Sequence, residues 1–160
     1  MPLQGMIVKP GVSTPGCKEP NKRTTLKGCK EWKKAMASTL TNLLYHIVFT
    51  TRKKQNLIIP VLSIELYPYI GGIIREEKEK LLKIGGTLNH VHILARFSAS
   101  VSVSEMMRRI KGASSKWVNE SSKSTSHFAW QRGYGAFSVS ESSVENVVNY
   151  IEKYTRKEYY

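Results

Sequence analysis

The sequence predicts a small α+β domain, a sandwich of helices on a largely antiparallel sheet. Two observations lead to this prediction. Strand-like and helix-like segments alternate from Tyr45 onward, and two of the strand-like segments are joined by a connection short enough for a hairpin. The chain has 160 residues, which is enough for one domain with a sizeable buried core.

The first half of the domain opens with a strand and a helix. The segment "YHIVFTT" (45–51) is rich in β-branched and aromatic residues and predicts a strand. Pro60 can occupy the first position of a helix. The segment "VLSIELYPYIGGIIREEKEKLL" (61–82) continues with helical spacing, which we expect Pro68 and the Gly71–Gly72 pair to interrupt.

A hairpin, a helix, a strand and a final helix follow. In "KIGGTLNHVHILARF" (83–97), Gly85–Gly86 indicates a turn between a short strand and a long one. The segment 102–121 has helical spacing with a serine able to cap its start. The segment "FAWQRGYGAFSVS" (128–140) is an aromatic, glycine-broken strand region, and 141–157 predicts a helix close to the end of the chain.

Charge is the unusual feature of the composition. The net charge of +13 suggests a polyanionic partner, either nucleic acid or an anionic membrane surface. There is no apolar run long enough to span a bilayer and no apolar core of a secretory signal, so we expect a cytoplasmic protein. The two cysteines do not form a CxxC pair, which argues against a disulfide framework or a zinc site.

The first 35 residues differ from the rest. The stretch "KPGVSTPGCKEPNKRTTLKGCKEWKK" has no periodicity, and we expect residues 1–35 to be a disordered basic extension before a domain at 36–160. They contain eight Lys/Arg and two Asp/Glu, so they supply +6 of the net charge and leave +7 for the domain. Either the extension is dispensable, as upstream sequence before a start at Met36 would be, or it is a basic arm on nucleic acid.

Two histidines occur one residue apart in the predicted long strand, in "NHVHILARF". Side chains alternate faces along a strand, so His90 and His92 point the same way and Val91 points to the opposite layer. Two imidazoles on one face can bind a single divalent ion, although a third ligand must then come from elsewhere. The alternative is a pair of half-exposed histidines that hydrogen-bond to their neighbours.

The last predicted helix carries two tyrosines beside its apolar stripe. The stripe consists of Val144, Val147, Val148 and Ile151. Tyr150 lies at the edge of this stripe, and Tyr154 projects from nearly the same direction four residues on. A phenol is a weak nucleophile that needs a cation or a base, and a phosphodiester is its natural electrophile, because attack conserves the bond energy in a phosphotyrosine. The alternative is that both rings only pack.

Four segments, in this order along the chain, resemble the single-tyrosine HUH transposases: "YHIVFTT", "NHVHILARF", "WQRGYGAFSVS" and "VVNYIEKY". The term HUH denotes histidine, a hydrophobic residue and histidine. The sequence is especially similar to the REP-associated tyrosine transposases and to related small insertion-sequence transposases. The resemblance covers residues 43–154, nearly all of the predicted domain.

The resemblance implies an HUH endonuclease fold, a ferredoxin-like sandwich with a central antiparallel sheet. It implies a transposase that cleaves single-stranded DNA, forms a 5′-phosphotyrosine and transfers the strand to a free 3′-hydroxyl. His90 and His92 match the residues that bind Mg²⁺ or Mn²⁺, and Tyr150 matches the nucleophile. Family members recognise DNA hairpins and commonly act as homodimers, in which one subunit can supply the histidines and the other the tyrosine.

The sequence departs from the family pattern in two places. The family usually has glutamine as third metal ligand four residues after the tyrosine, and this chain has Tyr154, a poor ligand for Mg²⁺. Relatives often continue beyond the last helix, whereas this chain ends in "TRKEYY", so we expect a truncated copy. The alternative function is therefore a catalytically decayed protein that only binds structured single-stranded DNA. The Tyr150 and Tyr154 pair also resembles two-tyrosine replication proteins, which fits the other motifs less well.

Several side chains are candidate contacts to DNA. The candidate phosphate contacts are Arg96, Arg108, Arg109, Lys111 and Lys116, although basic residues on a helix are often only its solvated face. Trp130 and Tyr134 could stack on unpaired bases, whereas the spacing of Trp117 favours the core. His46 could line the site, but a packed or surface imidazole is the expected role.

Overall fold

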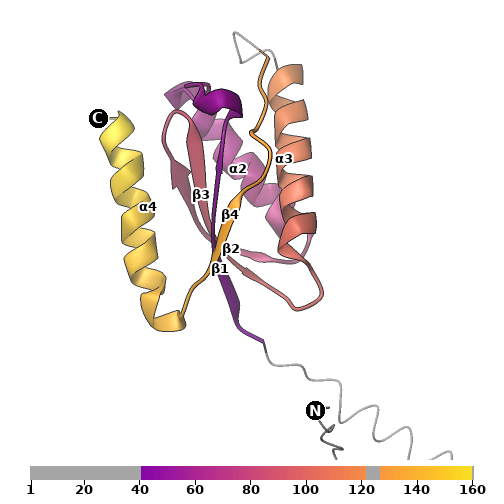
Figure 1. The fold of residues 1–160 in the computed structure, drawn as a ribbon, viewed down its shortest axis with the longest axis vertical. Helices are drawn as coiled ribbons and strands as arrows, with labels where there is room; N and C mark the ends of the chain where they lie inside the picture. Colours follow the sequence, from indigo (N-terminus) through magenta and orange to yellow (C-terminus); the bar gives the residue numbers. More distant parts are fainter. Residues whose placement is uncertain (1–40, 122–126, 160) are drawn as a thin grey trace, which may run out of the picture. The chain divides into compact units, whose positions relative to one another are not determined.

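A four-stranded sheet is the centre of the computed structural model, which describes residues 41–121 and 127–159 (Figure 1). Its strands are β1 (Leu43–Thr50), β2 (Lys80–Gly86), β3 (His90–Phe97) and β4 (Gly135–Ser138). They lie in the order β2-β3-β1-β4, and each pair of neighbours is antiparallel. The predicted α+β class with a mainly antiparallel sheet is confirmed. The predicted extension, residues 1–35, lies outside the described residues.

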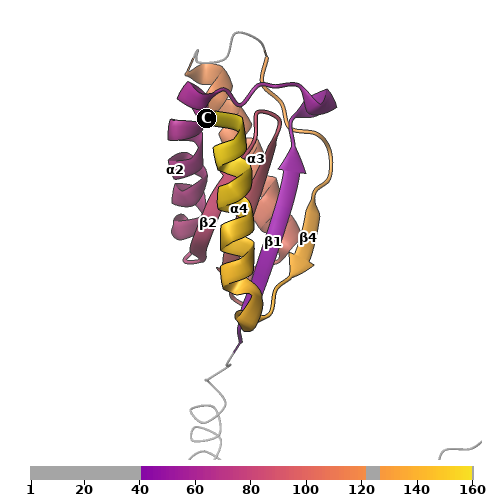
Figure 2. The same cartoon turned by 90° about the vertical axis from the view of Figure 1, so that its left-hand side faces the viewer.

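Helices cover both faces of the sheet (Figure 2). Helices α2 (Pro60–Glu76) and α3 (Val103–Glu120) lie on one face, and α4 (Val144–Tyr159) lies on the other. Alternate residues of the two central strands form the main core with α2 and α3, among them Ile47, Phe49, Val91 and Ile93. The intervening residues of β1 and β3 therefore face α4, and this layer contains the histidines.

The helix α2 is continuous, contrary to the interruption expected at Pro68 and the Gly71–Gly72 pair. Pro68 is exposed, so its ring meets no neighbouring element. The buried face repeats every four residues and consists of Leu62, Leu66, Ile70 and Ile74. Burial of four such side chains contributes about 1.5–3 kcal/mol each, which outweighs the roughly 3 kcal/mol cost of one proline and the smaller cost of the glycines.

The hairpin of β2 and β3 is confirmed, but its turn was predicted in the wrong place. Gly85 and Gly86 are the last residues of β2, and residues 87–89 make the turn. Both glycines are required by close approach rather than by turning. A Cβ on Gly86 would lie 2.2 Å from the carbonyl oxygen of His90, and a Cβ on Gly85 would lie 2.3 Å from Oγ1 of Thr155 on α4.

The helix α3 and the strand β4 lie within their predicted segments, and α4 extends two residues beyond the predicted 141–157. The helix α3 begins after Ser102, whose side chain accepts a hydrogen bond of 3.2 Å from the amide of Glu105. A short 3₁₀ turn, Glu141–Ser143, precedes α4. Trp130 is buried and donates a 2.9 Å hydrogen bond to Ser114, so it belongs to the core and not to a stacking surface.

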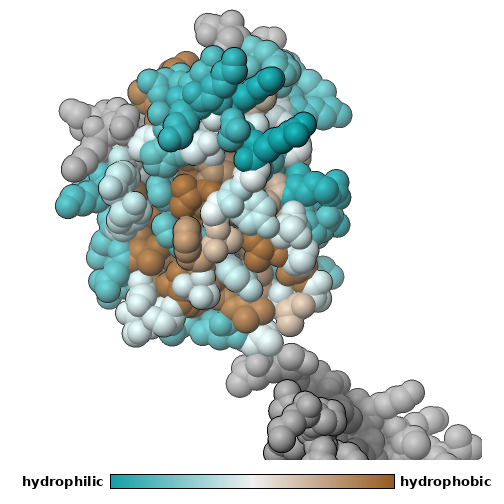
Figure 3. All heavy atoms as spheres, in the orientation of Figure 1, coloured by the Kyte–Doolittle hydropathy of each residue, from teal (hydrophilic) through white to brown (hydrophobic). Residues whose placement is uncertain are grey.

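The surface of the described residues is polar at one end. Figure 3 shows hydrophilic residues gathered at the upper end, where the loop after β1 and the C-terminal end of α3 lie in Figure 1. Of the helices formed by residues 41–121 and 127–159, none combines the length and apolarity that crossing a membrane requires.

Candidate functional site

The two histidines of β3 lie side by side beneath α4. The ring centroids of His90 and His92 are 5.0 Å apart and the rings are nearly perpendicular. His92 is buried, with 4% of its surface exposed. His90 is half-buried at the start of the strand, opposite Thr50 of β1. The pair therefore lines the end of β3 that adjoins the loop after β1.

The helix α4 brings both tyrosines to the same place. The ring centroid of Tyr150 lies 5.5 Å from that of His92, and the ring centroid of Tyr154 lies 6.1 Å from it. The two phenol rings are 4.5 Å apart, and both side chains are partly exposed, Tyr150 by 42% and Tyr154 by 39%. One chain thus supplies the imidazoles and the phenols, and the phenols remain open to a ligand.

Contacts of the residues next to the tyrosines hold α4 against β2. Ile151 is fully buried, and the Thr155 hydroxyl accepts a 3.1 Å hydrogen bond from the amide of Gly86. Lys83 of β2 forms an ion pair with Glu152. These contacts lie between the two tyrosines and directly after Tyr154, so they help to determine how far the phenols lie from the sheet.

His46 belongs to the same cluster, although sequence reasoning assigned it to packing or to the surface. Its Nε2 lies 3.0 Å from Nδ1 of His92, and the two rings are nearly parallel. The register explains the contact: Leu94 lies opposite His46, and Val48 lies opposite His92, so the histidines are diagonal neighbours on one face. Only the pairing of β1 with β3 could have revealed this residue.

A second set of hydrogen bonds holds His90. Its Nδ1 lies 2.8 Å from Oγ1 of Thr87 and 2.8 Å from Oδ1 of Asn89. The side-chain amide of Asn89 in turn donates a 3.0 Å hydrogen bond from Nδ2 to Oδ1 of Asn56. Each histidine of the pair therefore uses its Nδ1 within the protein.

Burial sets the charge of the site. Burial lowers the pKa of His92 to about 4, with smaller contributions from His90 and His46, and burial also lowers the pKa of His46. Both rings are therefore neutral at pH 7. Burial and interaction with Tyr154 raise the pKa of the Tyr150 hydroxyl, so this phenol is protonated at neutral pH.

The residues of the cluster can bind a cation, and the Nε2 of His92 is the atom that best fits this role. Its Nε2 is buried and has no hydrogen-bond partner among the described residues, which is costly unless a ligand satisfies it. Neutral imidazole nitrogen is a common ligand for divalent metal ions. Within residues 41–121 and 127–159, no three His, Cys, Asp or Glu side chains are grouped so that they could hold a metal ion. A third donor would come from Tyr154, from water or from a bound phosphate.

The pKa of His92 predicts acid sensitivity of the metal-free protein. The ring titrates near its ordinary value of 6.5 when unfolded and at about 4 when folded, so the unfolded chain binds the extra proton between these values. The free energy of unfolding should therefore fall by about 2.5 kcal/mol as the pH drops from 6.5 to 4. Urea unfolding of native protein and of His92→Gln at several pH values measures this. An equal pH slope in both proteins would contradict it.

Two of the predicted phosphate contacts lie on the opposite side of the sheet from the histidines. Arg108 and Arg109 are on α3, and both form ion pairs with Glu105, at 2.6 Å and 2.9 Å. Arg109 is also paired with Glu77. These two arginines are not brought together with the tyrosine and histidine cluster.

The other three candidates also have partners. Arg96 pairs with Glu141 at 3.1 Å, and Lys116 lies 3.8 Å from Glu120. The ammonium group of Lys111 donates hydrogen bonds of 2.6 Å and 2.7 Å to two backbone carbonyls in the loop before β4. Lys111 therefore orders that loop, which contains further basic side chains.

A basic loop that sequence reasoning missed follows β1. Arg52, Lys53 and Lys54 are exposed, and the two lysines have left-handed φ angles of 56° and 54°. The Lys53 amide donates a 3.2 Å hydrogen bond to the side chain of Gln131. Arg52 and Arg132 line one pocket. The signal for this surface was the run "TRKK" directly after the first strand, at the end of the sheet where His90 lies.

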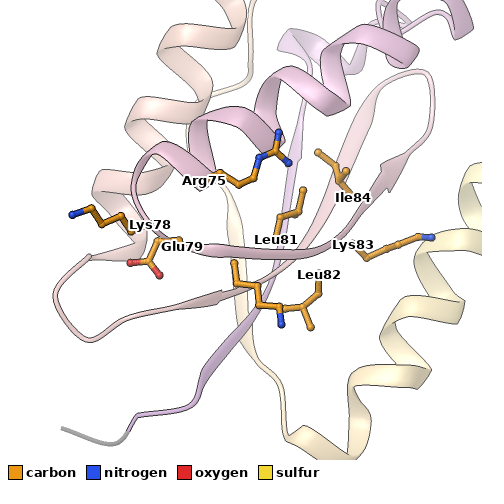
Figure 4. Close-up of a pocket in the computed structure, with 8 residues that line it drawn as sticks. Arg75, Lys78, Glu79, Leu81, Leu82, Lys83 and Ile84 are labelled. Atoms are coloured by element: carbon orange, nitrogen blue, oxygen red, sulfur yellow. The ribbon is translucent and has the colours of Figure 1, made fainter. Parts of the chain in front are cut away.

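A pocket along β2, an edge strand of the sheet, is separate from the cluster of histidines and tyrosines. Arg75, Lys78 and Glu79 line it together with five residues of β2 (Figure 4). Its lining includes neither the histidines nor the tyrosines. Figure 4 shows Lys83 pointing toward α4, which is how the edge of this pocket connects to the helix that carries Tyr150.

Comparison with known proteins gives a family and a fold. The family model described as "Transposase IS200 like" matches residues 39–154. No curated protein matches the chain. A solved structure from Deinococcus radiodurans R1, provisionally assigned as a transposase, is 18% identical, with a TM-score of 0.59 over 72% of this chain and 93% of that one. A REP-associated tyrosine transposase bound to a REP hairpin is 13% identical, with a TM-score of 0.55 over 71% of this chain and 67% of that one.

Proposed function

This chain belongs to the IS200-like transposase family, and on that premise we propose that it cleaves and rejoins single-stranded DNA with Tyr150 as its nucleophile. One observation carries the proposal: the half-exposed phenol of Tyr150 lies 5.5 Å, centroid to centroid, from the buried ring of His92 in the same chain. The Nε2 of that histidine has no hydrogen-bond partner among the described residues, so the phenol lies next to a nitrogen that is available to a ligand.

The proposed reaction exchanges one phosphoester for another. The Tyr150 oxygen forms a bond to phosphorus, and the bond from phosphorus to the 3′ oxygen of the neighbouring nucleotide breaks. The phenol loses a proton and the departing oxygen gains one, which leaves a 5′-phosphotyrosine and a free 3′-hydroxyl. Attack by a second 3′-hydroxyl reverses the step, so strand transfer needs no nucleotide cofactor.

We infer that His90 and His92 would hold a divalent ion, Mg²⁺ or Mn²⁺, with Tyr154 as a weak third donor. When bound, such an ion polarises the scissile phosphate and stabilises its developing charge. The residues of the chain orient the reacting groups: α4 holds the phenol over the histidines, and the turn at residues 87–89 holds the ring of His90.

We propose hairpin-bearing single-stranded DNA as the substrate, by analogy with the solved relative that is bound to a REP hairpin. The net charge of +13 favours such a polyanion. The phosphate path that fits the surface best runs along Arg52, Lys53 and Arg132, beside the end of β3 where His90 lies. A homodimer remains our expectation for the exchange of two strands.

The test uses oligonucleotides that carry a hairpin flanked by randomised single-stranded arms, because the target sequence is not known. With a 3′ label and Mn²⁺, denaturing gels should show a slowly migrating protein adduct that EDTA prevents. With a 5′ label, the same reaction should release a shorter strand with a free 3′-hydroxyl. Retarded migration in native gels with no adduct would instead support a protein that binds DNA without cutting it.

We expect the basic side chains of the loop after β1 and of the loop before β4 to control DNA affinity. The double variant Arg52→Ser with Arg132→Ser should weaken binding of the hairpin oligonucleotide by about tenfold at 0.1 M salt, because two phosphate contacts are lost. Affinity should also depend less steeply on salt: the slope of log affinity against log salt should become less negative by roughly 1.4, since each contact to single-stranded DNA contributes about 0.7. Fluorescence anisotropy at several salt concentrations measures both.

Arg108→Ser is the matched control for this double variant. Arg108 is 72% exposed but is paired with Glu105 on α3, away from the cluster. We expect its affinity and its salt slope to match those of the native protein. An equal loss in the control would move the DNA surface to α3.

A further inference from the structure

His46 touches both parts of the proposed site. Its Nε2 lies 3.0 Å from Nδ1 of His92, and its ring centroid lies 6.0 Å from that of Tyr150 in an edge-to-face arrangement. On its other side, the ring of Phe137 is 6.4 Å away. His46 is therefore held in one orientation between the strand that carries the histidine pair and the helix that carries the phenol.

One proton must lie between the two imidazoles. The Nε2 of His46 and the Nδ1 of His92 are 3.0 Å apart, so one of the two nitrogens donates a hydrogen bond and the other accepts it. A neutral imidazole has one N–H and one acceptor nitrogen. In the first arrangement Nδ1 of His92 donates to Nε2 of His46, and Nε2 of His92 is an acceptor. In the second arrangement His46 donates, and Nε2 of His92 carries a proton.

The surroundings of His92 favour the first arrangement. Its Nε2 is buried and no described residue bonds to it, so the second arrangement would leave an N–H donor buried without an acceptor. The first arrangement instead leaves a lone pair, which a cation can bind. Only this arrangement presents His92 as a metal ligand.

His90 also carries its proton on Nδ1, but its acceptor is a side-chain amide. Its Nδ1 faces Oδ1 of Asn89 at 2.8 Å, and that amide is oriented by the hydrogen bond from its nitrogen to Asn56. An amide oxygen can only accept, so Nδ1 of His90 carries the proton. A ligand histidine commonly donates its other N–H to a neighbouring acceptor, which sets its tautomer. Asn89 fills this role for His90, and the acceptor at the corresponding atom of His92 is His46.

We propose that His46 is a positioning residue: its Nε2 accepts the Nδ1 proton of His92 and so keeps Nε2 of His92 as the metal-binding atom. The inference rests on the proposed function for its use of a metal. The tautomer itself is a property of the metal-free protein, so it can be measured separately.

The first test is a tautomer measurement in metal-free protein labelled with ¹⁵N-histidine. Two-bond ¹H–¹⁵N correlations at pH 7.5, assigned by comparison with His92→Gln, should show His92 with its proton on Nδ1. In His46→Leu the acceptor is absent, and the proton should move largely to Nε2. In His46→Gln the side-chain oxygen reaches the position of Nε2, and the native tautomer should return. His127→Gln, at an exposed histidine, is the control.

The second test is Mn²⁺ affinity, measured from the electron paramagnetic resonance signal of the free ion. His46→Leu should raise the Kd ten- to a hundredfold, as loss of an acceptor behind a ligand histidine typically does. His46→Gln should recover most of the affinity, which a purely structural role for the imidazole ring would not predict. Circular dichroism confirms that each variant is folded.

Two results would overturn the role of His46. One is a native protein in which His92 carries its proton on Nε2. The other is a folded His46→Leu variant with the native tautomer or an unchanged Kd for Mn²⁺. If native protein and His90→Ala bind Mn²⁺ equally weakly, the metal site of the proposed function is wrong, and the tautomer spectra still decide whether His46 positions His92.

Discussion

Replacing Tyr150 with phenylalanine should reduce covalent adduct formation by at least about 10³-fold, because the oxygen that attacks phosphorus is absent. The substitution removes one hydroxyl from a half-exposed ring, so the fold and the packing against His46 and His92 should persist. Binding of the hairpin oligonucleotide should stay within about twofold, since a phenol contributes no charge to phosphate binding. Denaturing gels and fluorescence anisotropy measure the two properties on the same protein.

Tyr154→Phe is the matched control. Its ring lies 4.5 Å from that of Tyr150 and is equally exposed, so the variants differ only in which phenol is lost. We expect the adduct to form, with a moderate rise in the Mn²⁺ concentration that it requires. An adduct that persists in Tyr150→Phe and vanishes in Tyr154→Phe would reverse the two roles. A first cut without strand transfer in Tyr154→Phe would make Tyr154 a second nucleophile.

Gly85→Ala should separate the phenol from the histidines. The added Cβ would lie 2.3 Å from Oγ1 of Thr155 and 2.8 Å from Cγ2 of Ile151, so these side chains must shift, and we expect α4 to move away from β2 with them. Overpacking of this kind costs about 1–3 kcal/mol. Adduct formation should fall by at least about tenfold, because a displacement near 1 Å at the reacting atoms is that costly. Affinity for Mn²⁺ should fall much less than adduct formation, since His90 and His92 lie on β3 and α4 supplies only the weak third donor, Tyr154.

Gly112→Ala is the control for this substitution. Gly112 lies within α3, and nothing is within 4 Å of a Cβ placed on it. The variant should be as stable as the native protein or more stable by up to about 1 kcal/mol, because alanine favours a helix over glycine. Thermal unfolding and the adduct assay are measured together. Full adduct formation in Gly85→Ala would show that the docking of α4 on β2 does not control the site.

The sequence predicted what depends on local periodicity. Alternation along a strand placed His90 and His92 on one face, and helical spacing placed Tyr150 and Tyr154 together at the edge of an apolar stripe. Both relations are properties of a single element, and the geometry of that element enforces them. The first strand and the helices α3 and α4 were predicted for the same reason, whereas residues 80–82, expected to continue a helix, begin β2.

The sequence could not predict what depends on pairing between elements. His46 joins the cluster through the register of β1 on β3, and no local pattern specifies that register. Gly85 and Gly86 were assigned to a turn because a glycine pair commonly marks one, whereas here they admit α4 and the next strand. In α2, the buried stripe overrides the local preference of Pro68 to end a helix.

The attachment of α4 to its own sheet has a kinetic consequence. The phenol and the imidazoles of one polypeptide lie together, so the first scission should be first order in protein. Its rate per protein molecule should therefore not change on dilution. In the proposed homodimer, joining two ends requires two such molecules to meet, and its rate should therefore rise with the square of protein concentration at low concentration.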